Sequence, residues 1–166
     1  MLELIVKIGV FLAFFAGMEA AAWSTHKYVM HGWLWSLHRD HHEPHDKTFE
    51  RNDFFAFFFA IPSVTLFVIG WKLYPLASWA GAGILAYGIV YFVFHDVIVH
   101  KRIKIGMQSR NPYLKRIIQA HRLHHAVRTK EDGLSFGFLL APEPRRLKAE
   151  LQARGLTGKA AEVEAG

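Results

Sequence analysis

Residues 54–94 read FFAFFFAIPSVTLFVIGWKLYPLASWAGAGILAYGIVYFVF, a run of 41 residues with Lys72 as its one charged side chain. About 20 apolar residues form one helical crossing of the hydrocarbon core of a membrane, so this run is long enough for two crossings. The segment 71–75, WKLYP, divides it, because Trp and Tyr favour membrane interfaces and proline interrupts a helix. We therefore expect a hairpin of two membrane-spanning helices that turns near residues 71–75.

A further crossing is expected at residues 4–23, which are apolar except for Lys7 and Glu19. Glu19, together with Glu3 and the lack of any basic residue before Lys7, argues against a secretory signal peptide. A fourth crossing would require residues 87–100 to bend or residues 134–142 to re-enter the membrane. The predicted fold class is therefore all-α, an integral membrane helical bundle of three to four transmembrane helices, in a single domain spanning residues 1–166.

Ten of the eleven histidines form four clusters, which repeat one pattern twice. The first and third of these histidine boxes have the spacing H-x4-H, and the second and fourth have the spacing H-x2-H-H. In chain order the four boxes are His26 and His31; His38, His41 and His42; His95 and His100; and His121, His124 and His125. Imidazole is the commonest metal ligand among side chains, so we interpret all ten as candidate metal ligands. His45, after Pro44, is expected to be an ordinary surface histidine.

The hairpin determines which side of the membrane these histidine boxes face. The second box precedes the hairpin and the third box ends it, so the chain returns to the side that it left. The segment 24–53 holds four basic residues and the region after residue 100 holds more, whereas the opposite side shows only Lys7 and Lys72. The positive-inside rule then predicts a cytoplasmic, histidine-rich cap on an inner-membrane protein, with residues 134–142 packed over the site.

The spacings predict how the histidines point. Residues three and four positions apart share one face of an α-helix, so each H-x2-H-H trio is expected to point together. A five-residue step turns about 140° on an ideal α-helix. Each H-x4-H pair therefore serves two different ions, or its helix ends there or carries a π-bulge. The helix that carries the last trio is expected to begin with Asn111 as its N-cap and Pro112 at its first position.

The kinds of side chain available as ligands limit which metals fit the site. There are no cysteines, which excludes disulfides, Cys-ligated iron–sulfur clusters and Cys-containing zinc sites. Imidazoles suit iron, zinc, copper or nickel, and two five- or six-coordinate ions would use nearly all ten histidines, whereas one structural zinc would leave six idle. Redox-active iron fits this number best, and zinc is able to occupy the same ligands. Asp96 and Glu19 are candidate outer carboxylates: Asp96 as the acceptor for His100, and Glu19 either near His26 or simply at the membrane interface.

The net charge of +6 is concentrated in residues 101–130. No base-reading motif accompanies it, so we interpret it as a membrane-facing cytoplasmic segment and not as a nucleic-acid-binding surface. This stretch is also suited to steering an acidic electron donor. The phenylalanines of the hairpin are expected to face lipid or the core more than a substrate.

The four boxes HKYVMH, HRDHH, HDVIVH and HRLHH together resemble the histidine boxes of the membrane fatty acid hydroxylase superfamily, and the trailing SFGFLLAP is similar to its bacterial β-carotene 3-hydroxylases. The resemblance covers residues 1 to about 145, which implies a catalytic region 1–145 and a polar tail 146–166. It implies a non-haem di-iron monooxygenase that takes O2 and two electrons, hydroxylating carbon 3 of each β-ionone ring of β-carotene to give β-cryptoxanthin and zeaxanthin. No flavin, haem or nicotinamide motif is visible, so a ferredoxin-type donor is expected, with the carotenoid entering from membrane lipid.

Two other functions remain open at this point. A fatty acyl or sterol hydroxylase or desaturase would use the same two-metal chemistry, and would differ only in its product. A metal transporter would place its ligands at mid-membrane, whereas these histidines lie at the ends of the expected spans.

Overall fold

The computed structural model describes residues 1–43, 49–104, 106 and 110–156, so His45 and the last ten residues of the expected tail lie outside the described residues. The described part is helical with connecting loops and contains no strand, which confirms the all-α fold class. Three of its helices are long and apolar enough to cross a membrane: Leu2–Trp33, Arg51–Lys72 and Pro75–Val99.

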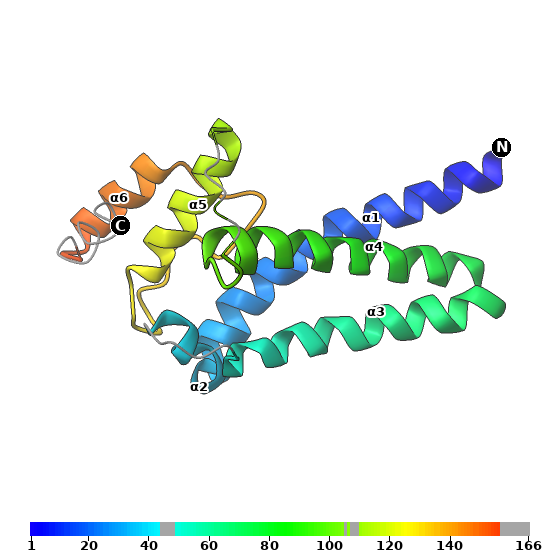
Figure 1. Ribbon diagram of the computed structural model, residues 1–166, viewed down its shortest axis with the longest axis horizontal. Coiled ribbons are helices and arrows are strands. Elements are labelled where there is room, and N and C mark those ends of the chain that lie inside the picture. Colours follow the sequence, from blue (N-terminus) through cyan, green and yellow to red (C-terminus); the bar gives the residue numbers. More distant parts are fainter. Residues whose placement is uncertain (44–48, 105, 107–109, 157–166) are drawn as a thin grey trace.

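The membrane bundle is one long helix against a helical hairpin (Figure 1). Helix α1 (Leu2–Ser24) continues into the π-helix η1 (Thr25–Trp33). Helix α3 (Phe54–Lys72) turns at Leu73 and Tyr74 into α4 (Pro75–Tyr91), which continues into a second π-helix, η4 (Phe92–Val99). The turn falls where the WKLYP segment predicted it. The N-terminus and this turn lie at one end of the bundle, and the cap lies at the other (Figure 1).

Small residues allow α4 to approach both of its neighbours closely. A Cβ atom at Gly83 would lie 2.5 Å from the carbonyl oxygen of Phe11 on α1, and one at Gly81 would lie 2.6 Å from the carbonyl oxygen of Ser63 on α3. The Ser63 hydroxyl in turn donates to the carbonyl of Gly81 at 2.9 Å. Close backbone contact and interhelical hydrogen bonds are what hold helices together where lipid removes the hydrophobic driving force.

The cap is built from short helices and two longer ones. The short elements are α2 (Trp35–His38) and the 3-10 helices η2 (Arg39–His42) and η3 (Arg51–Asp53). Helix α5 (Pro112–His125) begins as predicted, because the side chain of Asn111 accepts hydrogen bonds from the backbone N–H groups of Tyr113 and Leu114. Helix α6 (Pro144–Ala153) buries Leu147 and Leu151 in the same apolar cluster as α5, so this part of the expected tail is packed.

The hairpin phenylalanines divide as the composition suggested. Phe57 and Phe58 are 64% and 59% exposed on α3, whereas Phe55 is buried. Apolar side chains exposed on a membrane-spanning helix are the side chains that lipid covers.

Candidate metal centre

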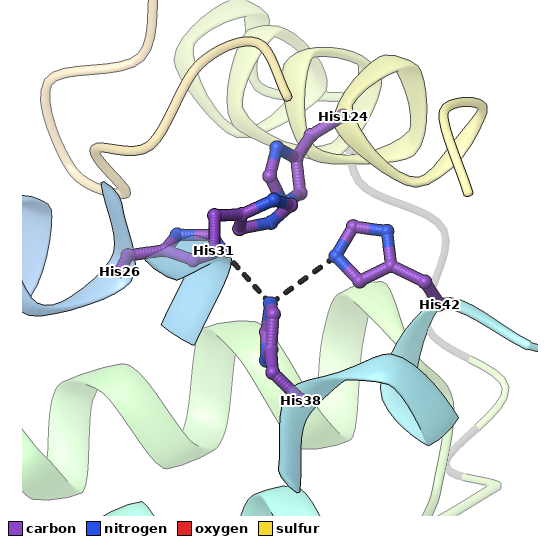
Figure 2. A group of neighbouring side chains, drawn as sticks. All are labelled: His26, His31, His38, His42 and His124. Atoms are coloured by element: carbon purple, nitrogen blue, oxygen red, sulfur yellow. Dashed lines mark hydrogen bonds between the residues drawn. The ribbon is translucent and has the colours of Figure 1, made fainter. Parts of the chain in front are cut away.

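Five histidines from four elements converge on one point, and we call them the first histidine cluster (Figure 2). They are His26, His31, His38, His42 and His124. The Nε2 atom of His38 lies 3.2 Å from that of His26 and 3.1 Å from that of His42, and the Nε2 atoms of His31 and His124 are 3.3 Å apart. All five side chains are buried, and each offers one ring nitrogen to the shared point.

The other five histidines lie beside them, and we call them the second histidine cluster. His41, His100, His121 and His125 converge on a second point, and His95 adjoins them. The Nε2 atom of His121 lies 3.0 Å from that of His100 and 2.9 Å from that of His125. His95 joins the group through its Nε2 atom, which is 3.2 Å from that of His41. The structure therefore brings all ten predicted residues together, five in one convergent group and four in a second group that His95 adjoins.

The two H-x4-H pairs are brought onto one face by π-helix. In η4 the backbone N–H of His100 donates to the carbonyl of His95 at 2.9 Å, a five-residue step that places one residue above the other. The ring centroids of this pair lie 4.5 Å apart, and those of His26 and His31 in η1 lie 5.2 Å apart. The π-bulge alternative is therefore confirmed for both pairs, and the alternative of two different ions is wrong for His26 and His31, whose ligand atoms belong to one group.

The expectation that each trio points together is also wrong. His38 and His42 belong to the first cluster, but His41 between them belongs to the second. In the same way, His121 and His125 belong to the second cluster and His124 to the first. A four-residue step keeps two side chains within about 40° of each other, and the third member projects far enough to the side to reach the neighbouring cluster. The two trios thus cross over between the two sites.

The outer nitrogens of the first cluster are all held by neutral amide oxygens. Each Nδ1 faces an oxygen that only accepts, so it carries the ring proton and leaves a lone pair on Nε2. The acceptors are Asn52 Oδ1 for His38 and the backbone carbonyls of Phe136, Lys130, Val127 and Leu134 for His26, His31, His42 and His124. Residues 127–136 therefore surround the site, in keeping with the expected packing of 134–142 over it. Ser135, with φ of 58°, turns the chain between two of these carbonyls.

Carboxylates take this role in the second cluster. Glu50, which the sequence reasoning did not single out, accepts from His41 Nδ1 at 2.5 Å. Asp96 lies 3.3 Å from Nδ1 of His95, so the expectation that it serves His100 is corrected to the neighbouring histidine. Arg102 binds Asp96 and Asp53 at 2.7 Å each, and these contacts, that with Asp53 above all, raise its pKa.

Glu19 was expected near His26, and the structure corrects this expectation. Its carboxylate is buried and holds the loop that covers the histidines. Its Oε1 accepts from the backbone N–H of Phe138 at 2.8 Å and of Leu140 at 2.9 Å, and its Oε2 accepts from the Tyr87 hydroxyl at 2.7 Å. The carboxylate thus links α1, α4 and the segment whose Phe136 carbonyl holds His26. An interface-facing position is excluded by the burial, since Glu19 is 8% exposed.

Burial keeps the cap histidines neutral, which is the form that binds metal. Burial, with a smaller contribution from His31, lowers the pKa of His42 to about 3. Burial, with His95 next in size, lowers the pKa of His100 to about 2. For the remaining cap histidines burial is again the largest cause, and it lowers the pKa well below 6.5: His38, His41, His121, His124 and His125.

The spacing of these nitrogens fits a metal ion. With a metal–nitrogen distance of about 2.1 Å, neighbouring ligands lie about 3.0 Å apart in an octahedral site and about 3.4 Å apart in a tetrahedral one. The Nε2 pairs described above are 2.9 to 3.3 Å apart. Neutral imidazoles held this close, with their outer N–H groups satisfied, have the donor set and orientation of first-row transition-metal sites.

An apolar cavity of about 350 Å³ reaches the metal centre from within the bundle. Its walls come from α1, α3, α4 and the loop 136–138, with Phe55 and Phe59 among them, so part of the phenylalanine-rich hairpin faces this cavity. His26 of the first cluster and His95 and His121 of the second lie in its wall. The cavity therefore joins both clusters to the interior of the membrane bundle.

Comparison with known proteins gives a consistent family. The family model described as fatty acid hydroxylase matches residues 11–141. The chain is 50% identical over 139 residues to the Beta-carotene hydroxylase of Pantoea ananas, covering 83% of this chain and 79% of that protein. It is 43% identical over 140 residues to the Beta-carotene hydroxylase of Paracoccus sp. (strain N81106 / MBIC 01143), covering 84% and 86%. No solved structure matches this chain.

A plant protein shares the same region. The chain is 39% identical over 131 residues to the chloroplastic Beta-carotene 3-hydroxylase 2 of Arabidopsis thaliana, covering 76% of this chain and 43% of the plant protein.

Proposed function

Since this chain belongs to the fatty acid hydroxylase family, we propose that it is a membrane monooxygenase that hydroxylates carbon 3 of the β-ionone rings of β-carotene, giving β-cryptoxanthin and then zeaxanthin. The observation that carries the proposal is the pair of five-histidine clusters at the end of an apolar cavity. An aliphatic C–H bond is not broken by ordinary acid–base groups, so a redox metal centre beside an apolar cavity is what this reaction needs.

The proposed cofactors are two iron ions, one held by each histidine cluster. When bound, they supply the activation of O2, with two electrons from an external donor, so that one oxygen atom enters the C–H bond and the other leaves as water. Zinc suits the same ligands but has no redox chemistry, so it would bind and leave the protein inactive. The neutral ligands leave the positive charge of the ions in place, which favours reduced, anionic forms of oxygen.

The protein itself positions the ring and excludes water. The cavity volume of about 350 Å³ lies at the small end of the range for ligand pockets, so it accommodates one ring and the nearby chain while the rest of the carotenoid stays in the bilayer. Its lining is mostly apolar and aromatic, with Tyr91 stacked on His95 and Tyr87 beside Tyr91. A dry site of this kind protects a strongly oxidising centre from water.

The cap is proposed to face the cytoplasm from a bacterial inner membrane. Basic residues lie mainly at the cap end, as the positive-inside rule requires. The proposed electron donor is a reduced ferredoxin-type protein, which exposed Lys101 and Lys104 would attract through its acidic surface. Arg102 is bound to Asp53 and Asp96, so its role is structural and it is not part of this docking surface.

Expression in a β-carotene-producing bacterium tests the reaction. We expect zeaxanthin and β-cryptoxanthin from the wild type and neither from His121→Ala, because His121 lies in the second cluster and in the cavity wall. Gln119→Ala, an exposed change on the same helix, is the matched control and should behave as wild type. If the wild type leaves β-carotene unchanged, the substrate assignment is refuted, and hydroxylated or desaturated acyl chains or sterols in the same cells would favour the alternative substrates.

Metal exchange tests the cofactor. Removal of metal with a chelator should abolish hydroxylation, ferrous iron with a reductant should restore it, and zinc should bind without restoring it. Restoration by zinc would exclude a redox role for the metal.

A further inference from the structure

The two histidine clusters differ in what holds their outer nitrogens. All five Nδ1 atoms of the first cluster face neutral amide oxygens, for example Asn52 Oδ1 at 2.7 Å from His38. In the second cluster His41 faces the carboxylate of Glu50 at 2.5 Å, and His95 faces that of Asp96 at 3.3 Å. Both clusters offer imidazole nitrogens, so this difference in charge is a clear chemical asymmetry between them.

Both carboxylates are largely buried beside the histidines that they contact. The side chains of His41 and Glu50 are 1% and 8% exposed, and those of His95 and Asp96 are 2% and 13% exposed. A buried carboxylate that accepts the N–H of an imidazole raises the electron density on the opposite ring nitrogen, and its charge also attracts a cation across the ring. Solvent screens both effects little at such low exposure.

We propose that the two clusters are unequal metal sites, and that the second binds a divalent ion more tightly because Glu50 and Asp96 strengthen His41 and His95 as donors. The inference rests on the proposed function in one respect, namely that both clusters hold metal. Glu50 has the larger effect, because its contact is shorter and because Arg102, 2.7 Å from Asp96, offsets part of the charge of Asp96.

Solvent exposure of the histidines would favour the opposite order of metal affinities, so the test distinguishes exposure from carboxylate charge. His100 and His125 of the second cluster are partly exposed, whereas every histidine of the first cluster is buried. If solvent access governed affinity, the first cluster would be the tighter site. A variant that changes charge without changing shape separates the two causes.

The experiment is a zinc titration of the full-length, metal-free protein in detergent against a chromophoric chelator. We expect two dissociation constants. Glu50→Gln keeps an oxygen acceptor and removes only the charge, and it should weaken the tighter constant by about 10- to 100-fold while leaving the looser one unchanged. Asp96→Asn should act on the same constant to a smaller extent.

The reciprocal variant is Asn52→Asp, which gives the first cluster a carboxylate in place of the amide beside His38. It should tighten the looser constant and reduce the difference between the sites. His124→Ala and His121→Ala assign the constants: the first should abolish the looser constant and the second the tighter one. Far-ultraviolet circular dichroism of each variant identifies any that fails to fold, in which case Asn52→Asp and Glu50→Gln each decide the question alone.

Equal constants in the wild type would overturn the inference, as would a Glu50→Gln effect confined to the looser constant or absent altogether. Those results would leave the proposed function standing, because two metal ions would still bind. A wild-type protein that binds no zinc would instead overturn the metal centre and the inference together.

Discussion

Replacing Glu19 with alanine should detach the loop that covers the metal centre. Glu19 lies on a membrane-spanning helix, yet its carboxylate receives the backbone N–H groups of Phe138 and Leu140 and the hydroxyl of Tyr87. The same loop carries the Leu134 and Phe136 carbonyls that hold His124 and His26. The carboxylate therefore stabilises the orientation of two first-cluster histidines without touching either.

The magnitude follows from the donors that lose their acceptor. A buried donor without a partner costs about 1–3 kcal/mol, so two amides and one hydroxyl together cost roughly 3–9 kcal/mol. Whole proteins are stable by about 5–15 kcal/mol, so the loop opens locally at the least. Tyr87→Phe removes one of the three hydrogen bonds and should cost about 1.5–3 kcal/mol, the range for a bond to a charged acceptor.

The assay measures metal per chain, zeaxanthin yield and the thermal unfolding midpoint in detergent. Glu19→Ala should lose the first-cluster metal, lose hydroxylation and unfold at a lower temperature, and Tyr87→Phe should lie between it and the wild type. Glu3→Ala is the matched control on the same helix, since Glu3 is exposed and its ion pair is with Lys7, one helical turn away. Full metal content together with wild-type turnover in Glu19→Ala would refute the bracing role.

Three further predictions concern the cavity, the contact between α1 and α4, and the exposed lysines. Gly88→Phe should fill the cavity, because Gly88 lies in its wall and a Cβ there meets nothing within 4 Å, and it should therefore raise KM for β-carotene at unchanged metal content. Gly9→Phe on α1, where a Cβ also meets nothing within 4 Å, is the control, and equal effects of the two changes would contradict the cavity as substrate site. Gly83→Val should force α1 and α4 apart and cost at least about 1–3 kcal/mol, and a thermal midpoint equal to wild type would exclude that close approach. Neutralising Lys101 and Lys104 together should weaken the salt dependence of turnover, and an unchanged salt response would remove the docking proposal.

The membrane hairpin and the gathering of the histidines were predictable because both depend on features read along the chain. A 41-residue apolar run is long enough to cross twice, and a hairpin returns the chain to its starting side. The second and third boxes were therefore expected on the same side of the membrane. The start of α5 was predictable for the same reason, since Asn111 caps the helix through its own neighbours.

The allocation of histidines to the two sites was not predictable from spacing. A three-residue step on a helix turns about 60° to one side, and whether that side faces its own cluster or the next depends on which helices pack there. His41 on η2 lies beside His95 of the second cluster, whereas His124 on α5 lies beside His31 of the first. Only the three-dimensional arrangement contains that information.

The hydrogen-bond acceptors of the outer histidine nitrogens were even less predictable from the sequence. Glu50 lies eight residues beyond His42 with no pattern to mark it, and the backbone carbonyls that hold four of the first-cluster histidines have no signature in the sequence at all. Glu19 was singled out because an ionisable group inside a span suggests function. Its actual partners, 119 and 121 residues further along the chain, depend on the loop folding back over α1.

The division of each histidine trio between the two clusters couples the positions of the clusters. His41 and His42 are adjacent in η2 yet serve different clusters, and His124 and His125 are divided in the same way on α5. The rings of His42 and His125 stack with centroids 4.3 Å apart, so the clusters are in direct contact. A rotation of η2 or of α5 would therefore displace histidines of both clusters at once. If each cluster holds a metal ion, as proposed, this arrangement would keep the two ions in a fixed relation to each other.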